Sequence, residues 1–204
     1  MTDIEKFINY LSSFSNLIDS TNLYKGDQIE SSIRKENVIR YLTKMKKINS
    51  TTLLLGEAPG YKGCRLTGIQ FTSEKILKEN YFFSNENYKF INPLNKLESE
   101  ISATIVWNEL KNYNILPLIW NIYPFHPHQK DNYLTNRTPT LQELKLGKNI
   151  LMDLMKIFNI KKILTLGRKA ESQLVDLNIN SQYIRHPANG GKKEFITGLQ
   201  IEMK

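Results

Sequence analysis

The stretch "LLLGEAPGYKGCRLTGIQFTS", residues 53–73, decides the fold of this chain. It begins with a continuous apolar run, Leu53 to Leu55, which ends at Gly56 and passes at once into small and turn-forming residues. A short apolar run without alternation is typical of a strand buried on both faces of a parallel sheet. The carboxylate of Glu57 follows directly. The stretch therefore predicts an α/β domain whose first strand carries an acidic side chain to the edge of the sheet.

Three later apolar runs have the same character, and segments of helical periodicity separate them. The further strands are expected at 116–125, 161–167 and 181–187, and the helices between them at 98–113, 140–158 and 168–177. This alternation predicts a three-layer α/β/α fold around a mostly four-stranded parallel sheet with right-handed crossovers. A ligand site is then expected at the carboxyl ends of the strands.

Two helices are expected before the first strand. Thr2 and Glu5 have the spacing of a capping box, and so do Thr140 and Glu143 later in the chain. A chain of 204 residues is long enough for one good core and short for two, so we expect a single domain. Residues 1–50 would form a helical extension packed on a core made by residues 51–204.

The segment 73–97 is rich in asparagine and aromatic residues and has no long periodicity. Its aromatic side chains could stack on the bases of a nucleic acid, or a loop could pack them onto the domain. We interpret the segment as a loop of the second kind.

Composition limits the partners. The chain has 28 Lys and Arg against 20 Asp and Glu, a net charge of +8, which suits a polyanion such as nucleic acid but is equally compatible with a plain basic surface. Its single cysteine, Cys64, excludes an intrachain disulfide and any cluster that needs several cysteines. No apolar run reaches the ~18 residues of a membrane span. We expect a cytoplasmic monomer with no membrane contact.

Polar residues follow each expected strand. Because carboxyl ends of parallel strands meet at one edge of a sheet, a carboxylate, an amide and an imidazole should converge there beside an aromatic ring. They are Glu57 after the first strand, Asn121 in the second, His186 at the end of the fourth, and Phe71 in the stretch quoted above.

His126 and His128, in "PFHPH", raise the alternative of a metal site. No third ligand is apparent near this pair, and two histidines alone are more typical of a loop. We therefore expect no metal.

Four motifs together resemble the uracil-DNA glycosylase superfamily. They are "GEAPG" (56–60), "TGIQF" (67–71), Asn121 at a strand end, and "HPANGG" (186–191), and the resemblance covers residues 51–191. "GEAPG" is similar to the thermostable branches, whereas "TGIQF" looks like the "TGVPF" of the single-strand-selective branch, with Gln70 in place of proline. The thermostable branches hold a four-cysteine iron–sulfur cluster, which Cys64 alone cannot form, so we expect no cofactor.

The resemblance implies a monofunctional enzyme that hydrolyses the N-glycosidic bond of a flipped uracil, or a related deaminated base, in single- or double-stranded DNA. Phe71 would stack on the base and Asn121 would read its edge. His186 would stabilise the anionic uracil O2, and Glu57 would orient the attacking water. The motifs contain no lysine for a Schiff base, so the product would be an abasic site.

The remaining candidate residues fall into two groups. Gly56, Ala58, Gly60 and Tyr61 would contact the base, and Thr67, Gly68, Arg185, Asn189, Gly190, Gly191 and Lys192 would contact the DNA backbone.

Two departures from the family pattern keep alternatives open. Ala58 stands where many members have an acid or an asparagine, and Gly60 stands where the best-known branch has a tyrosine that excludes thymine. A catalytically silent nucleic-acid-binding protein on the same fold is therefore a second hypothesis. Action on another damaged base or on a free nucleoside is a third.

Overall fold

The computed structural model describes residues 1–84 and 86–203. Asn85, in the predicted 73–97 loop, and Lys204 lie outside the described residues. Its centre is a four-stranded parallel sheet in the order β3-β2-β5-β6. Leu54 lies opposite both Ile119 and Leu164 in the register. The strands span Thr52–Gly56 (β2), Leu118–Asn121 (β3), Lys162–Leu166 (β5) and Gln182–Ile184 (β6).

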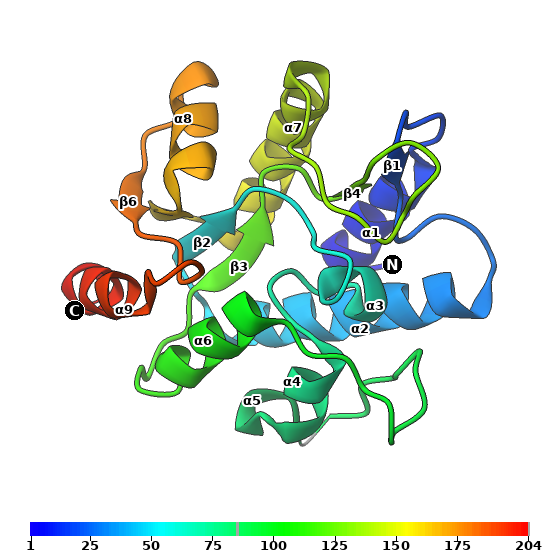
Figure 1. Cartoon of the computed structure of the whole chain (residues 1–204), viewed down its shortest axis with the longest axis horizontal. Helices are drawn as coiled ribbons and strands as arrows, with labels where there is room; N and C mark the ends of the chain where they lie inside the picture. Colours follow the sequence, from blue (N-terminus) through cyan, green and yellow to red (C-terminus); the bar gives the residue numbers. More distant parts are fainter. Residues whose placement is uncertain (85, 204) are drawn as a thin grey trace.

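Helices cover both faces of this sheet. Figure 1 shows α7 (Leu141–Phe158) and α8 (Arg168–Asp176) on one side, and α6 (Ile101–Leu110) and α9 (Lys192–Glu202) on the other. The predicted three-layer α/β/α fold class is therefore confirmed. The chain passes from β2 to one neighbour, β3, and then returns to the other, β5, so the direction of winding reverses beside β2. Such a reversal opens a crevice at the carboxyl ends of the strands.

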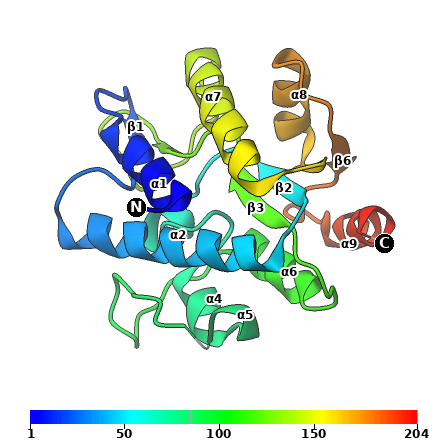
Figure 2. The ribbon, with the colours of Figure 1, turned by 180° about the vertical axis from the view of Figure 1, so that it is seen from behind.

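The N-terminal segment contributes two helices, α1 (Asp3–Ser13) and α2 (Ile29–Ile48), which pack against each other (Figure 2). Both predicted capping boxes are present, at Thr2 and at Thr140. Between the helices, β1 (Ser20–Thr21) pairs antiparallel with β4 (His126–Pro127). The apolar side chains of α1 and α2 belong to the same buried cluster as those of the sheet.

Helix α2 also covers the outer edge of β3. The backbone N–H of Ile119 points away from β2 and donates a 2.8 Å hydrogen bond to the hydroxyl of Tyr41. The N–H of Leu118 points to the other side, toward β2, and donates to Oγ of Ser50 at 3.2 Å. The edge donor at Ile119, which a further strand would otherwise satisfy, therefore has a side-chain partner.

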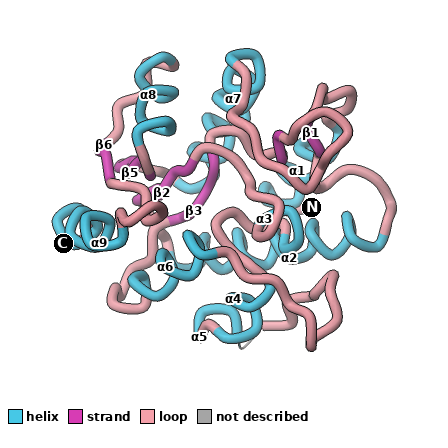
Figure 3. The backbone as a smooth tube through the Cα atoms, viewed as in Figure 1, coloured by secondary structure: helices cyan, strands magenta, loops and turns pink. Residues whose placement is uncertain are grey.

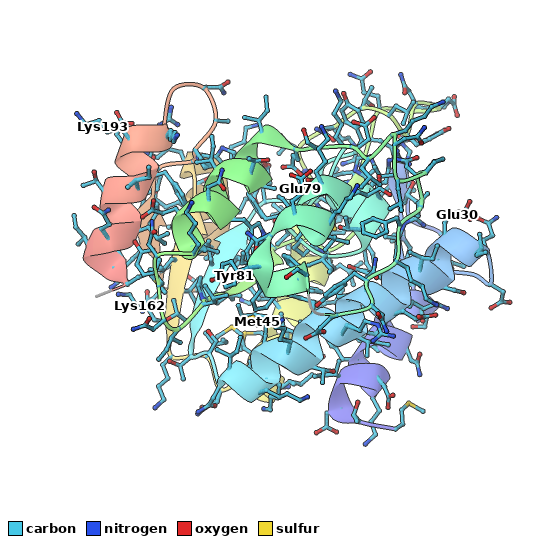
Figure 4. The ribbon with its side chains drawn as sticks, turned by 90° about the horizontal axis from the view of Figure 1, so that it is seen from below. Glu30, Met45, Glu79, Tyr81, Lys162 and Lys193 are labelled. Atoms are coloured by element: carbon cyan, nitrogen blue, oxygen red, sulfur yellow. The ribbon has the colours of Figure 1, made fainter. Side chains whose placement is uncertain are left out.

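The aromatic segment contains two short helices where a loop was predicted, α4 (Glu74–Glu79) and α5 (Tyr81–Ser84). Neither helix is long enough to show a repeating apolar pattern. Residues 86–100 then lead to α6 without a regular helix or strand (Figure 3). Phe82 and Phe83 are buried against Trp107, which confirms that the segment packs its aromatic side chains onto the domain. Tyr81 is an exception, because it lies at the surface (Figure 4).

Other elements differ from the sequence prediction. The expected strand 116–125 ends at Asn121, and the expected helix 98–113 is limited to Ile101–Leu110. Helix α3 (Cys64–Thr67) and α9 were not predicted. In α9 only Phe195 and Leu199 are buried, which is too narrow an apolar stripe to be seen in the sequence. Within the described residues, no helix is both long and apolar enough to cross a membrane.

Candidate active site

A cleft of about 480 Å³ lies at the carboxyl ends of the four strands. All four strand ends contribute to its wall, with Glu57 after β2, Asn121 in β3, Leu166 in β5 and His186 after β6. Phe71 completes this set from the loop that follows α3. The cleft thus brings together the carboxylate, the amide, the imidazole and the aromatic ring that the sequence singled out.

Phe71 is held in an unusual backbone conformation. Its φ of 48° lies in the left-handed region, where a bulky side chain is strained. The indole N–H of Trp107 donates a 2.8 Å hydrogen bond to the Phe71 carbonyl. The ring lies over Gly56, where a Cβ atom would overlap it and come within 2.5 Å of Asn121 Oδ1. Glycine at position 56 is therefore a condition for Phe71 and Asn121 to occupy their places.

Asn121 presents an unpaired acceptor. The side chain is buried, and its Nδ2 donates a 2.5 Å hydrogen bond to Oε1 of Gln70. Its Oδ1 is also buried and has no hydrogen-bond partner among the described residues. A buried acceptor without a partner is costly, and at a cleft wall it is satisfied when a ligand brings a donor.

Glu57 is positioned from two sides. Its backbone carbonyl accepts a 3.1 Å hydrogen bond from the N–H of Tyr123, which ties the β2 loop to the chain beyond β3. Its carboxylate Oε1 accepts a 3.0 Å hydrogen bond from Nε2 of Gln173, a buried residue of α8. The second carboxylate oxygen remains for a water molecule in the cleft.

The backbone determines the protonation of His186. The N–H of Ala188 lies 3.2 Å from Nδ1 and donates to it, because a backbone N–H cannot accept. Burial, and secondly the charge of Arg185, lower the pKa of His186, which favours the neutral ring at pH 7. A neutral imidazole that accepts at Nδ1 carries its proton on Nε2. His186 therefore has one N–H to offer in the cleft.

Glu100 is a cleft residue that the sequence reasoning missed. It lies directly before α6 and lines the wall near Gly60, and burial raises its pKa from 4.5 to about 7. No motif marks it, because it reaches the cleft from a connection far from the strand ends. Only the three-dimensional arrangement identifies it as a second carboxyl group of the site.

The ring of His126 contacts two backbone carbonyls and does not line the cleft. Its Nδ1 lies 2.9 Å from the Pro59 carbonyl of the β2 loop and its Nε2 lies 3.0 Å from the Tyr133 carbonyl of a neighbouring loop, and the neutral ring can donate to one of the two. Burial lowers its pKa. His128 contacts Thr21 and the Gln129 carbonyl. Across residues 1–84 and 86–203, no group of three His, Cys, Asp or Glu side chains is arranged to hold a metal ion.

The structure separates the remaining candidates. Ala58, Gly60, Arg185 and Asn189 line the cleft. Tyr61, Gly190, Gly191 and Lys192 are not part of its wall, and Gly191 is buried.

Thr67 and Gly68 are not brought to the cleft. Thr67 is fully buried, and its hydroxyl is 2.7 Å from that of Thr72. Gly68 packs on the backbone of Arg34, because a Cβ atom there would be 2.6 Å from the Arg34 carbonyl oxygen.

Positive charge surrounds the entrance. Arg168 and Lys169, after β5, and Arg185, after β6, line the cleft and are exposed. Lys193 projects to solvent at the start of α9, whereas Lys162, near the other end of that helix, pairs with Glu202 (Figure 4). Arg168 is paired with Glu171, so Lys169 and Arg185 at the cleft and Lys193 on α9 are the cations available to a polyanion.

Comparisons with known proteins place this geometry in context. No protein-family model and no curated protein matches the sequence. The crystal structure of wild-type SMUG2 from Pedobacter heparinus matches the three-dimensional structure with a TM-score of 0.67. The two proteins share a fold. The alignment covers 97% of this chain and 94% of SMUG2, at 19% sequence identity, so the likeness extends to the N-terminal helices.

Proposed function

We propose that the protein is a DNA base-excision glycosylase that hydrolyses the N-glycosidic bond of a flipped uracil, or a related deaminated base, and leaves an abasic site. One observation carries the proposal: Glu57, Phe71, Asn121 and His186 line a single cleft at the carboxyl ends of the strands. The shared fold with SMUG2 supports it. We further propose that a monomer performs the reaction on DNA.

Recognition of the base would use Phe71 and Asn121. A uracil rotated out of the DNA stack would lie on the Phe71 ring, which replaces part of the stacking energy lost in the duplex. Its edge would meet the buried Oδ1 of Asn121, which has no other partner among the described residues. This contact would satisfy an acceptor that is otherwise left unpaired.

Bond cleavage would use His186 and Glu57. As the glycosidic bond breaks, negative charge develops on the base and positive charge on the sugar. The Nε2–H of His186 would donate to the base O2, where the charge appears only in the transition state. Glu57 would orient a water molecule through its free oxygen and offset the charge of the sugar. Water would then add to the anomeric carbon, with its proton passing to Glu57.

The DNA backbone would be bound at the rim of the cleft. Arg185, Asn189 and Gly190 lie on the segment between β6 and α9, and Lys192 is the first residue of α9; cations and backbone N–H groups there suit phosphate. The N–H of Gly191 donates to the Ala188 carbonyl, and that of Tyr61 bonds to Asn136, so neither is free in this conformation. Thr67 and Gly68, being buried, have no place in this proposal.

Strand scission tests the proposal. Purified protein is incubated with single- and double-stranded oligonucleotides that carry one uracil, hypoxanthine, xanthine or mismatched thymine, followed by treatment with alkali. We expect scission at uracil, lost in His186→Ala. Absence of scission at every base would refute the enzyme assignment.

Ala58 favours a second candidate, a silent DNA-binding protein on the same fold. This residue lines the cleft at the place where many members of the resembled family have an acid or an asparagine. Salt-dependent binding of uracil-containing DNA without any abasic product would support this candidate.

A further inference from the structure

Gln70 connects Asn121, the residue proposed to recognise the edge of the base, to the protein interior. It is fully buried, and its Oε1 accepts the hydrogen bond from Asn121 Nδ2. Its Nε2 lies 3.4 Å from the hydroxyl of Tyr24 and 3.4 Å from the carbonyl oxygen of Pro124. We propose that Gln70 is a positioning residue that fixes the orientation of the Asn121 amide and thereby the class of base the cleft accepts, an inference that rests on the proposed function.

Two backbone carbonyls set the direction of this chain of hydrogen bonds. The Tyr24 hydroxyl donates its only proton to the Gly68 carbonyl at 2.8 Å, so it meets Gln70 with its lone pairs. Burial raises the pKa of Tyr24 well above its usual value, so the hydroxyl keeps that proton. The Pro124 carbonyl can only accept. Gln70 must therefore turn its NH₂ group to these two oxygens and its Oε1 to Asn121.

The same reasoning fixes Asn121. Because Oε1 of Gln70 can only accept, Asn121 must present Nδ2 to it, which leaves Oδ1 for the cleft. Reversal of the Asn121 amide would place two oxygens against each other with no proton between them. Reversal of both amides would place the Gln70 oxygen against Tyr24 and Pro124 instead. Only one orientation satisfies every group of this network apart from Asn121 Oδ1, which is left for a ligand.

This orientation selects a chemical class. Asn121 offers an acceptor at Oδ1 and, beside it, the second hydrogen of Nδ2. The complement is a ring N–H next to a carbonyl, as at N3 and O4 of uracil or N1 and O6 of hypoxanthine. Cytosine presents an unprotonated nitrogen and an amino group, the reverse pattern, and would face acceptor against acceptor. A methyl group on N3 of uracil would also remove the required donor.

Binding of uncleavable DNA tests the inference without relying on hydrolysis. The probes are oligonucleotides with one 2′-fluoroarabino nucleotide bearing uracil, N3-methyluracil or cytosine, and affinity is measured by fluorescence anisotropy. The wild type should prefer uracil to either other base by at least ~100-fold, since a buried donor or acceptor left unpaired is strongly rejected. Gln70→Met, similar in size but without the amide, should reduce the uracil-to-cytosine ratio to about fivefold or less, whereas N3-methyluracil, which complements neither orientation of the Asn121 amide, should stay excluded.

Gln70→Glu provides a rescue arm. A carboxyl oxygen that faces Asn121 accepts from Nδ2 whether the side chain is protonated or ionised, so Gln70→Glu should retain the preference for uracil. Gln70→Met has no such acceptor, so the contrast between the two variants separates the hydrogen bond to Asn121 from the size of the side chain. If circular dichroism shows that Gln70→Met does not fold, the base preference of Gln70→Glu, compared with that of the wild type, tests the inference.

The outcomes separate the inference from the proposed function. A uracil preference that Gln70→Met abolishes, without scission of ordinary uracil DNA, supports the positioning role and refutes hydrolysis. Scission by the wild type, together with an unchanged preference in folded Gln70→Met, overturns the inference and leaves the enzyme assignment intact. Loss of the uracil preference in folded Gln70→Glu also overturns it.

Discussion

Trp107 supports the strained backbone of Phe71. Its indole N–H donates a 2.8 Å hydrogen bond to the carbonyl of Phe71, whose φ is 48°. Both residues are buried, so water cannot replace this bond. The position of the Phe71 ring over Gly56 therefore depends on a residue of α6.

Trp107→Phe tests this dependence. We expect a loss of about 1–2 kcal/mol in the free energy of unfolding, measured with urea, and a larger fractional loss of uracil excision. Trp120→Phe is the matched control, because the Trp120 indole N–H is buried and has no partner among the described residues. The control should lose less stability and keep its activity. Equal effects of the two substitutions on excision would contradict the role given to Trp107.

Glu57→Gln should separate chemistry from binding. The neutral amide keeps the size of the side chain but cannot accept a proton or offset the charge of the sugar, so single-turnover excision should fall by about 100-fold or more. Affinity for uncleavable uracil DNA should change little. Gln173→Leu removes only the hydrogen bond to Glu57 Oε1, and we expect a smaller loss of rate. A comparable loss of binding or folding in Glu57→Gln would show that Glu57 is structural.

His186 should make the protein less stable in acid. Burial lowers its pKa below 6.5 in the folded state, so between that folded pKa and 6.5 the unfolded chain binds more protons. Stability should therefore decrease as the pH falls below about 6.5. The same holds for His126, whose pKa is also lowered by burial. Urea midpoints from pH 5 to pH 8 should show a weaker decrease for His186→Gln, and an unchanged slope would count against a buried neutral imidazole.

Glu100 should have the opposite dependence on pH. Its pKa is raised from 4.5 to about 7, so the folded state holds the proton more tightly than the unfolded chain. The stability associated with the neutral carboxyl is present below about 4.5 and is lost as the pH rises through about 7. At pH 8, Glu100→Gln should be more stable than the wild type by about 2 kcal/mol, less than the full shift because the cleft admits solvent. The difference should shrink at pH 4.5, and a constant difference would exclude Glu100 as its source.

The sequence allowed prediction of those functional side chains that lie at or directly after the end of a strand. Leu53 to Leu55 predict a buried strand without any tertiary information, and parallel topology then places the residues after each strand at one edge. Glu57, Asn121 and His186 could be selected on that basis. Phe71 needed the resemblance as well, because nothing local distinguishes it from a core residue.

The supporting residues could not be predicted in the same way. Gln70 is buried 51 positions before Asn121, and Gln173 lies 116 positions after Glu57, so their contacts exist only in the folded chain. Glu100 belongs to no motif. Helices α4, α5 and α9 were missed because helices so short or so narrowly apolar lack a clear period of 3.6 residues.

The contact of Tyr41 with Ile119 has a consequence for shortened forms of the protein. An exposed edge strand is a template on which a second chain can add its own strand. Helix α2 occupies that place along β3 without being a strand itself. A fragment that begins at residue 51 would keep the four-stranded sheet and the cleft residues but expose this edge. We expect such a fragment to self-associate through β3, and we expect residues 1–50 to prevent this association in the whole chain.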